Sequence, residues 1–412
     1  MTCLDNKFDF VLIGADLNCY NIARAVHEAF GKLSYAFGRQ ELGCTKYSKI
    51  VKFTAVPKLD DPDTFISTLR GFRKQLGDDR QLVLFACTDD YAGLAIRFRD
   101  ELEAENFIIP YAKKCDFDRF QSKADFYKVC EAYGVPYPKT QVFSKGFDPS
   151  LLAPEALGFD YPIIVKPSSS ILYWKHPFDG MKKVYSAKDP AQAEKILNEI
   201  FASGYPDTVV AQDMIPGGDD RMHVLTTYSG ADGRVRMACL GHVLLEEHTP
   251  KGRGNHAAIV TCNNPKLVER FTSLLDSIGY TGFANFDIKF DERDGSYRVF
   301  EINMRQGRSN YYVTAAGMNL AKLVADDRVF GVKSETAKLV TNEIFWHIVP
   351  KGIVYRYTRG TENEALVKKL VSEHREASSY FYPYDTRRDI RRLYYALGYT
   401  FNHYKKYRQY KN

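Results

Sequence analysis

The sequence predicts an α/β protein built from more than one domain. A chain of 412 residues is too long for a single hydrophobic core, so two or three domains are expected. In its N-terminal quarter, short apolar runs alternate with helical patterns, which favours a parallel sheet. Residues 282–305 instead alternate apolar and polar residues on both sides of a glycine turn, which predicts an antiparallel hairpin.

The N-terminal sheet is predicted from five elements. Strands are expected at residues 8–14, 33–37 and 81–87, and helices at 18–30 and 92–103. The turn after the first strand contains one glycine, Gly14, so the G-x-G-x-x-G fingerprint is missing. Dinucleotide binding is therefore not expected, and the sheet is predicted to supply part of a substrate cleft.

A second series of helices and strands follows the first sheet. Helices are predicted at 122–134, 189–204 and 264–278, each opened by a capping residue or a proline and closed by a glycine. Strands are predicted at 161–167 and 208–215. The earlier of these strands carries Lys166, and a polar loop at 168–183 is expected after it.

Three polar side chains share one face of the predicted hairpin. Asp287 lies between two apolar residues, and Glu301 and Asn303 alternate with apolar residues in the same way. A three-residue loop at 293–295, with Gly295 in the left-handed conformation, would pair Asp287 with Glu301. Opposed carboxylates repel one another unless a cation lies between them, and oxygen ligands of this kind suit Mg²⁺. The alternative is the solvated outer face of an amphipathic hairpin.

Cysteine usage and the N-terminal residues predict a cytoplasmic protein. Eight cysteines are scattered without a C-x-x-C pair, which is typical of buried thiols in a reducing compartment. The first residues lack a basic segment, and Asp9 interrupts the first apolar run, so no signal peptide is expected. No apolar run reaches the roughly 18 residues that a membrane helix needs.

The C-terminal tail concentrates the positive charge. The net charge is +6, and residues 381–412 contain eight Arg or Lys against two Asp, which accounts for all of it. Ten aromatic residues are interleaved with these charges. Nucleic acid, an anionic membrane surface and an anionic substrate all suit such a tail. We favour a terminal helix that packs its Tyr/Leu face on the body and keeps its charges in water.

The order of the motifs resembles the ATP-grasp superfamily over about residues 5–330. Lys123 lies at a helix start, Lys166 lies at a strand end, and Glu301-Ile-Asn303-Met-Arg305 is the most specific match. The resemblance implies the ATP-grasp fold, a subclass of α/β architecture. It divides the chain into a parallel α/β domain at 1–120, a small α+β lid subdomain at 121–212, a metal and substrate subdomain with an antiparallel sheet at 213–330, and a C-terminal extension with the basic tail at 331–412.

The resemblance also implies which residues bind the nucleotide. Lysine ammonium groups would hold the phosphates as movable point charges, and serine hydroxyls with backbone N–H groups would cradle them. A short segment would read the adenine edge through its backbone, and a carboxylate would accept from the ribose. By position these residues are Lys123, Lys166, Ser168, Ser169, Gln212, Asp213, Met214, Ile215 and Asp220, the last preferred over Asp219. The loop after Lys166 lacks the glycines that the family usually has there.

The remaining implied residues bind metal and act on the transferred group. Asp287, Glu301 and Asn303 match the ligands of Mg²⁺, for which Mn²⁺ is an alternative. Arg305, with Lys166, matches the catalytic cations beside the phosphoryl group. Superfamily chemistry is usually carboxylate activation by ATP, followed by attack of an amine and release of ADP and phosphate.

Within the superfamily, the loop at 245–257 and the tyrosine-rich C-terminus look like the D-aspartate ligases of Gram-positive cell-wall synthesis. These enzymes join the β-carboxylate of D-aspartate to the lysine side-chain amine of a peptidoglycan precursor. The resemblance implies an amino-acid substrate and an anionic, amine-bearing partner such as a UDP-linked muropeptide. Arg253, His256 and Arg308 are the candidate substrate residues, and a surface hairpin is the alternative for the loop.

Other functions stay open at this stage. Another ATP-grasp amino-acid or dipeptide ligase ranks next, and an ATP-grasp kinase ranks below it. A nucleotide-binding regulator is disfavoured because the metal set is intact. No nucleic-acid partner is expected, the basic tail leaves weak association with the inner membrane surface open, and the sequence predicts no oligomeric state.

Overall fold

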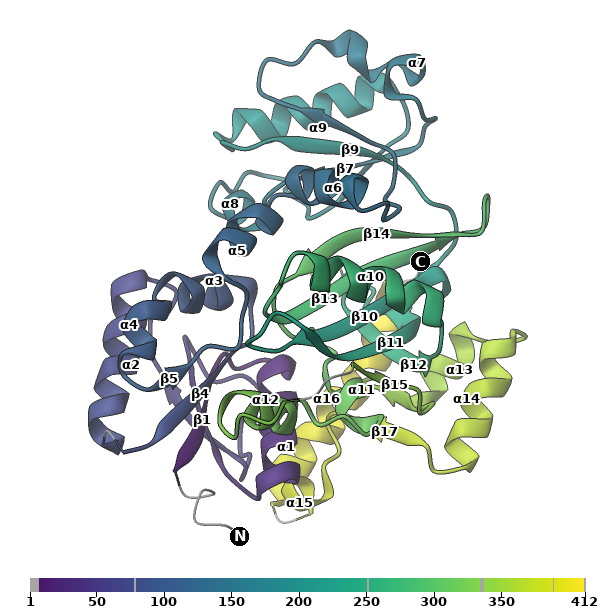
Figure 1. Ribbon diagram of the computed structural model, residues 1–412. Coiled ribbons are helices and arrows are strands. Elements are labelled where there is room, and N and C mark those ends of the chain that lie inside the picture. The colour runs from purple at the N-terminus through teal and green to yellow at the C-terminus, as the bar shows by residue number, and fades with distance from the viewer. Residues whose placement is uncertain (1–6, 78, 250–251, 334–336, 388, 411–412) are drawn as a thin grey trace. The chain divides into compact units, whose positions relative to one another are not determined.

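The computed structural model describes residues 7–77, 79–249, 252–333, 337–387 and 389–410 (Figure 1). The chain divides into two compact units. The first contains residues 1–114, 219–285 and 303–412, and the second contains 115–218 and 286–302. The chain therefore leaves the first unit twice and returns twice.

The first unit begins with a parallel sheet in the order β3-β2-β1-β4-β5. Its strands are β1 (Phe8–Ile13), β2 (Ser34–Gly38), β3 (Val51–Ala55), β4 (Gln81–Ala86) and β5 (Phe107–Ile108). Its helices are α1 (Leu17–Phe30), α2 (Pro62–Leu76), α3 (Asp89–Arg97) and α4 (Arg99–Glu103). The three predicted strands are confirmed, whereas β3, β5 and α2 were not anticipated. The single helix predicted at 92–103 is wrong in detail, because it begins at Asp89 and is interrupted at Phe98.

A second, mixed sheet completes the first unit. Its order is β13-β10-β11-β12-β16-β17, with β15 paired to β11, and β14 follows β13. The strands are β10 (Met222–Ser229), β11 (Val235–Glu246), β12 (His256–Cys262), β13 (Gly282–Asp291), β14 (Ser296–Asn303), β15 (Lys338–Val340), β16 (Phe345–His347) and β17 (Glu376–Ser378). β13 begins in the first unit and ends in the second, and the chain returns to the first unit at the end of β14.

The helices of the later chain return to the N-terminal sheet. They are α10 (Pro265–Ser277), α11 (Tyr311–Ala315), α12 (Leu320–Arg328), α13 (Lys351–Tyr357), α14 (Glu362–Ser372), α15 (Pro383–Thr386) and α16 (Ile390–Gln409), and a short 3-10 turn, η2 (Asp219–Arg221), precedes β10. α12 packs beside α1 (Figure 1), where the Asn319 side chain donates to the Ala25 carbonyl at 2.8 Å. Contacts this distant in sequence make the first unit one folded body.

The second unit is built around an antiparallel sheet in the order β6-β9-β7-β8. Its strands are β6 (Thr140–Phe143), β7 (Ile163–Pro167), β8 (Tyr185–Ala187) and β9 (Val209–Asp213). Its helical segments are α5 (Lys114–Gln121), α6 (Lys123–Ala132), η1 (Pro149–Leu152), α7 (Pro154–Leu157), α8 (Ser170–Trp174) and α9 (Pro190–Ala202). The apolar stripe of α9, which includes Leu197 and Ile200, is buried against this sheet (Figure 1).

The predicted loop at 168–183 is only partly a loop, because α8 lies within it. Ser169 caps this helix by accepting from the Leu172 N–H, and Tyr173 is 1% exposed. The Tyr173 hydroxyl lies 2.7 Å from that of Tyr185 and also donates to the Lys182 carbonyl. A cap and one buried aromatic ring are enough to order a single helical turn.

The β13–β14 hairpin agrees with the predicted chain reversal but has a longer turn. Gly295 has φ 72°, as expected for the left-handed position. The strands end at Asp291 and resume at Ser296, so four residues separate them rather than three. The Gly295 N–H donates to the Asp291 carbonyl, and the Asp291 carboxylate accepts from the Arg293 N–H, so the turn closes around Asp291.

The basic tail is largely the helix α16, and one part of its prediction is wrong. Arg392, Ala396, His403 and Tyr407 face inward and are at most 3% exposed. The prediction placed charges in water and aromatic residues against the body, but Arg392 is buried and other apolar residues of α16 are exposed. Among the described residues, no helix has the length and hydropathy needed to cross a bilayer.

The buried carboxylate of Asp385 anchors α16. It forms an ion pair with Arg392 at 3.2 Å, and neither side chain is more than 2% exposed. The Tyr20 hydroxyl donates to it at 2.8 Å, the Ser48 hydroxyl at 2.9 Å and the Lys49 N–H at 2.6 Å. The site joins the start of the chain to its last helix.

We expect Asp385→Ala to lower the free energy of unfolding by about 3–5 kcal/mol, because a buried guanidinium loses its counter-charge. Urea denaturation followed by circular dichroism measures this. The control is Asp389→Ala, which removes the N-cap of the same helix at a more exposed position and should cost clearly less. Equal losses in the two variants would contradict the anchoring role.

Candidate active site

In the second unit, two predicted phosphate lysines converge on Glu301. Lys123 is the first residue of α6, after Ser122 at the N-cap, and its Nζ lies 3.1 Å from Glu301 Oε2. Lys166 is the penultimate residue of β7, and its Nζ lies 5.0 Å from the centre of the Phe300 ring. A helix start, a strand end and the β14 strand therefore bring these groups together.

Burial and neighbouring charges shift both ionisable partners. Burial lowers the pKa of Lys166 to about 7; Lys123 adds to this shift, while Glu301 and Asp287 oppose it. The ammonium of Lys123 holds the pKa of Glu301 far below its usual range, against the effect of burial. Glu301 is therefore ionised, and Lys166 is poised between its charged and neutral forms near neutral pH.

The hairpin presents the predicted metal ligands in the expected alternation. Phe286 and Ile288 are fully buried, while Asp287 between them is partly exposed, as are Glu301 and Asn303. Asp287 and Glu301 both act electrostatically on Lys166, so their carboxylates lie near it. The positive charge expected beside these carboxylates includes lysine ammonium groups, and Mg²⁺ as a further cation stays a prediction.

The donor set nevertheless fits a hard divalent cation. Two carboxylates and an amide oxygen on adjacent, rigid strands are oxygen ligands of the kind that Mg²⁺ takes when substrate phosphates supply the others. Asn303 follows Glu301 by two residues and therefore shares its strand face, and its amide donates to the Asn285 carbonyl at 3.4 Å. Among the described residues, no group of three or more His, Cys, Asp and Glu side chains is placed so that it could hold a metal ion, and the set of two carboxylates and one amide stays a prediction.

The two predicted phosphate-loop serines already have partners within the second unit. Ser168 is fully buried, and its hydroxyl lies 2.7 Å from that of Thr208. The Ser169 N–H donates to the Tyr205 hydroxyl at 2.9 Å, and the Ser169 hydroxyl caps α8. These contacts fix the loop next to Lys166, and contact with phosphate through these hydroxyls stays a prediction.

The predicted adenine segment begins inside the sheet. Gln212 and Asp213 are the last residues of β9. Gln212 pairs with Thr140 of β6 and Ile164 of β7, and its side chain donates to the Thr140 hydroxyl at 2.8 Å. Met214, which follows the strand, is 37% exposed. Backbone groups just beyond the strand therefore suit the reading of a ligand edge better than those inside it.

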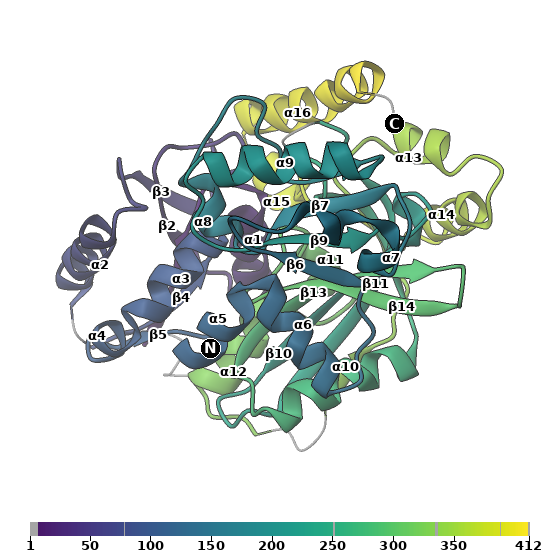
Figure 2. The same ribbon diagram turned by 90° about the horizontal axis from the view of Figure 1, so that it is seen from above.

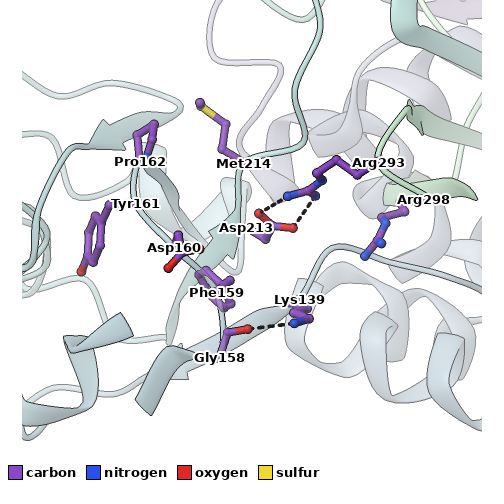
Figure 3. A pocket seen from close by; sticks show the side chains of 10 residues that line it. All are labelled: Lys139, Gly158, Phe159, Asp160, Tyr161, Pro162, Asp213, Met214, Arg293 and Arg298. Atoms are coloured by element: carbon purple, nitrogen blue, oxygen red, sulfur yellow. Dashed lines mark hydrogen bonds and ion pairs between the residues drawn. The ribbon is translucent and has the colours of Figure 1, made fainter. Parts of the chain in front are cut away.

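Two side chains from the hairpin tie down the segment that follows β9. The Lys289 ammonium donates to the carbonyls of Ile215 and Gly217, at 2.9 and 2.7 Å. The Arg293 guanidinium donates to both carboxylate oxygens of Asp213, at 3.1 and 2.6 Å (Figure 3). The start and the end of the segment 213–217 are thus both held by the hairpin, an arrangement we call the hinge clamp.

Arg293 is itself held from the other side. The fully buried carboxylate of Asp291 lies 2.7 Å from Arg293 and 3.1 Å from Arg298. Hydrogen bonds from Arg293 lower the pKa of Asp291, against burial, and those to Asp291 and Asp213 raise the pKa of Arg293. Asp291 and Arg293 are therefore both ionised at neutral pH.

A cavity of about 380 Å³ opens beside the hinge clamp (Figure 3). It is lined by Lys139, Gly158, Phe159, Asp160, Tyr161, Pro162, Asp213, Met214, Arg293 and Arg298. Lys139 donates to the Gly158 carbonyl at 2.9 Å, Arg293 is bound to Asp213, and Arg298 lies 2.5 Å from Asp294. Because these cations already have partners, we assign the cavity no ligand.

In the first unit, the two aspartates of the acidic turn, Asp219 and Asp220, have different partners. The Asp219 carboxylate accepts from the Glu246 N–H at 3.0 Å and lies 3.4 Å from His248. The Asp220 side chain is 44% exposed, and its nearest cation is Arg221 at 3.8 Å. Asp219 is therefore engaged in holding β11, and Asp220 as the ribose ligand stays a prediction.

Two arginines of the first unit are each paired with a carboxylate. Arg305 Nε lies 2.9 Å from Asp89, at the start of α3, and Arg308 lies 2.8 Å from Glu247. Burial raises the pKa of Asp16, although Arg308 and Arg305 oppose the shift, so this carboxyl lies close to both arginines. The first unit therefore presents two guanidinium groups beside exchangeable acidic partners.

The other predicted substrate residues lie around Glu247. The Glu247 N–H donates to the Asn255 carbonyl at 2.8 Å, Arg253 is exposed, and His256 is 7% exposed on β12 opposite Glu246. Of the three predicted residues, Arg308 forms an ion pair with Glu247 at 2.8 Å. Arg253 and His256 stay predictions.

Comparison with known proteins identifies the family. A D-aspartate ligase from Enterococcus faecium (strain Aus0004) is 39% identical over 418 residues, which covers 99% of this chain and 98% of the relative. This chain belongs to the D-aspartate ligase family. It is an ATP-dependent carboxylate–amine ligase, as the resemblance implied. No protein-family model matches it.

Solved structures confirm the ATP-grasp fold of the ligase. The biotin carboxylase domain of 2-oxoglutarate carboxylase from Hydrogenobacter thermophilus has a TM-score of 0.60 and 15% identity, over 81% of this chain and 72% of that one. An N5-carboxyaminoimidazole ribonucleotide synthetase has a TM-score of 0.56 and 12% identity, over 82% and 80%. An L-amino acid ligase from Bacillus licheniformis has a TM-score of 0.53 and 15% identity, over 77% and 73%. At these identities the likeness shows the fold alone.

Sequence reasoning missed several partners of the candidate residues. Lys289 and Arg293 lie in the hairpin that was analysed, but their partners are about 70 to 80 residues earlier in the chain. Asp89 and Glu247 were likewise not anticipated as partners of arginine. Thr88 followed by two aspartates is a helix N-cap signal that does place Asp89 at the start of α3.

We expect the Lys166 amine of the ligase to titrate near pH 7, and Glu301→Gln to move the midpoint lower, because Glu301 opposes the shift. Trace labelling with acetic anhydride across a pH series, followed by peptide mass spectrometry, measures this. The urea-unfolded protein is the control and should show the ordinary lysine value of 10.5. A midpoint near that value in the folded protein would contradict the proposed environment.

Proposed function

We propose that this ligase joins the β-carboxylate of D-aspartate to the lysine side-chain amine of a peptidoglycan precursor. The full-length 39% identity to an E. faecium D-aspartate ligase is the observation that supports this substrate. An aspartate oxygen attacks the γ-phosphorus of ATP, and ADP leaves. The amine nitrogen then attacks the acyl carbon of the resulting acyl phosphate, and phosphate and one proton are released.

Lys123 and Lys166 are proposed to bind the ATP phosphates. Lys123 already forms an ion pair with Glu301, whose charge also favours the ammonium form of Lys166, so phosphate oxygens would replace one set of negative charges by another. An arriving polyanion favours the charged form of Lys166, whose pKa of about 7 leaves it partly neutral beforehand. Binding of ATP should therefore take up protons.

Asp287, Glu301 and Asn303 are proposed to hold Mg²⁺, or Mn²⁺ in its place. The biotin carboxylase domain noted above was solved with MgADP, which supports the same pairing here. When bound, a divalent cation neutralises charge on the phosphates during transfer. The hairpin keeps the two carboxylates and the amide on rigid strands, which preserves their positions while the nucleotide changes.

Arg305 and Arg308 are proposed to hold the two carboxylates of aspartate. Each has a carboxylate partner in the ligand-free protein, Asp89 or Glu247, that a substrate carboxylate can displace. A monocarboxylate would leave one arginine with its internal partner and gain only one such exchange. This arrangement favours a dicarboxylic amino acid. Arg253 and His256 are proposed to contact the precursor instead.

The setting of the reaction follows from the proposed substrates. A nucleotide-linked muropeptide is anionic, carries the accepting amine and is made in the cytoplasm, where we place the ligase. The basic tail is proposed to give weak association with the inner membrane surface. Nucleic acid is not proposed as a partner.

The decisive experiment supplies ATP, MgCl₂ and D-aspartate, with and without a lysine-containing UDP-muropeptide. We expect one ADP and one phosphate for each amide formed, and clearly lower rates with D-asparagine, D-alanine or L-aspartate. Coupled assays for ADP and phosphate, with mass spectrometry of the product, measure this. Dipeptide formation from neutral amino acids, or a stable phosphorylated acceptor, would contradict the proposal.

Two isosteric variants test the proposed metal site in the same assay. Asp287→Asn and Glu301→Gln each remove one charge and almost no volume, so the fold should be retained. Turnover should fall by about a hundredfold or more, because the negative charge on the phosphoryl group in transfer would lose the divalent cation that neutralises it. Near-normal turnover at saturating Mg²⁺ would remove the metal assignment.

The hinge clamp gives a prediction specific to this chain. We expect Arg293→Ala to raise the KM for ATP on the order of tenfold with a smaller effect on kcat, because the segment after β9 loses its position. Arg298→Ala is the matched control, since Arg298 also binds Asp291 but not Asp213. Steady-state kinetics at varied ATP measure both, and equal changes in the two variants would count against a role for the clamp.

A further inference from the structure

α16, which lies along the upper edge of the view in Figure 2, has a second set of large apolar side chains that do not pack on the first unit. Its members share large side chains and high exposure: Ile390 83%, Tyr394 75%, Phe401 63%, Tyr404 40%, Leu397 39% and Leu393 36%. Scattered apolar residues on a surface need no explanation, but six on one 20-residue helix form a patch.

The spacing of these residues makes the patch one continuous stripe. From Ile390 to Tyr404, five of them follow at intervals of four, three, four and three residues, which keeps them on one side of a helix. The inward residues Arg392, Ala396, His403 and Tyr407 lie on the other side and are almost fully buried. The exposed stripe is therefore not the edge of the core but a separate surface, which we call the outer stripe.

Positive charge borders one side of the outer stripe. α16 contains no Asp or Glu between residues 390 and 409, and Lys405, Lys406 and Arg408 lie along it, while Arg391 is paired at 2.9 Å with Asp389 just before the helix. At 100° per residue, Arg391 and Lys405 border one side of the stripe, and Arg408 extends it by a further turn. Arg392 does not contribute, because it is buried against Asp385.

We infer that the outer stripe of α16 binds the surface of an anionic lipid bilayer. A helix with an exposed apolar stripe, aromatic side chains and bordering cations lies flat in the headgroup region, with rings inserted and cations at the phosphates. Self-association through the same stripe is disfavoured, since a twofold contact would bring like charges together. This inference extends the proposed membrane association of the tail and does not depend on the chemistry of the ligase.

The test uses the full-length protein and sedimentation with vesicles, either pure phosphatidylcholine or phosphatidylcholine mixed with phosphatidylglycerol. We expect binding to the mixed vesicles, weakened by salt, and about tenfold or greater loss in the double variant Tyr394→Ser, Phe401→Ser. Lys405→Gln with Arg408→Gln should reduce the preference for anionic lipid. Val332→Ser with Leu339→Ser, two residues exposed elsewhere on the first unit, is the matched control and should bind normally.

Three results would overturn the inference. These are no binding by the wild type, equal binding by wild type and the Tyr394/Phe401 variant, or a wild-type dimer that this variant converts to a monomer in analytical ultracentrifugation. The last would make the stripe a self-association surface. Ligase activity on soluble substrates should be unchanged in the α16 variants. Vesicle binding without ligase activity in the wild type would reject the proposed function and leave this inference standing.

Discussion

The ion pair between Lys123 and Glu301, beside Lys166, is the interaction on which the second unit's candidate site depends. Lys123 comes from a helix start and Glu301 from the hairpin, and the charges of both act on Lys166 at a strand end, so three elements are coupled. A partly buried lysine pair would repel strongly without a carboxylate beside it, and the carboxylate would be poorly solvated without the lysines. Glu301 therefore favours the charged form of Lys166, whose pKa of about 7 still leaves it partly neutral near neutral pH.

The first unit follows the same rule with arginine. Arg305 is neutralised by Asp89 and Arg308 by Glu247, at 2.9 and 2.8 Å. If a substrate carboxylate binds one of these arginines, it replaces the internal carboxylate and does not neutralise an unpaired charge. Exchange limits affinity, because the internal contact must be given up, but it raises selectivity, since only a ligand with matching charge restores the balance. Under the proposed function, a substrate with two carboxylates would pair with both arginines, whereas an amino acid with a neutral side chain would pair with only one.

The sequence was informative wherever a local pattern determined structure. Ser122 before Lys123, the apolar strand that carries Lys166, and Gly295 in the turn are signals contained in a few neighbouring residues, and all three are found as expected. β3 was not anticipated, because four of its five residues, including Lys52, are at least partly exposed and the strand lies at a sheet edge.

The other features that the sequence did not predict depend on contacts outside the local sequence pattern. α8 depends on a single cap and on Tyr173 packing against Tyr185, a contact across the loop that no periodicity reports. Which side of α16 is exposed depends on which side the rest of the first unit covers. Tyrosine and arginine occur on all sides of this helix, so the sequence alone does not show which side is buried. The partner of Arg293 lies 80 residues away, so only the folded chain shows that the turn of the hairpin reaches β9.

The β13 strand connects the metal ligands to the nucleotide segment by simple geometry. Asp287, Lys289 and Asp291 alternate with apolar neighbours and so share one strand face, each about 7 Å beyond the last. Asp287 lies beside Lys166, Lys289 holds the carbonyls after β9, and Asp291 secures the arginine that binds Asp213. One face of one strand therefore sets the spacing between the group proposed to bind metal and the segment proposed to bind adenine. A register slip of one residue would turn all three side chains to the opposite face, so the buried Asp291 pair that holds the end of the strand also protects the geometry of the site.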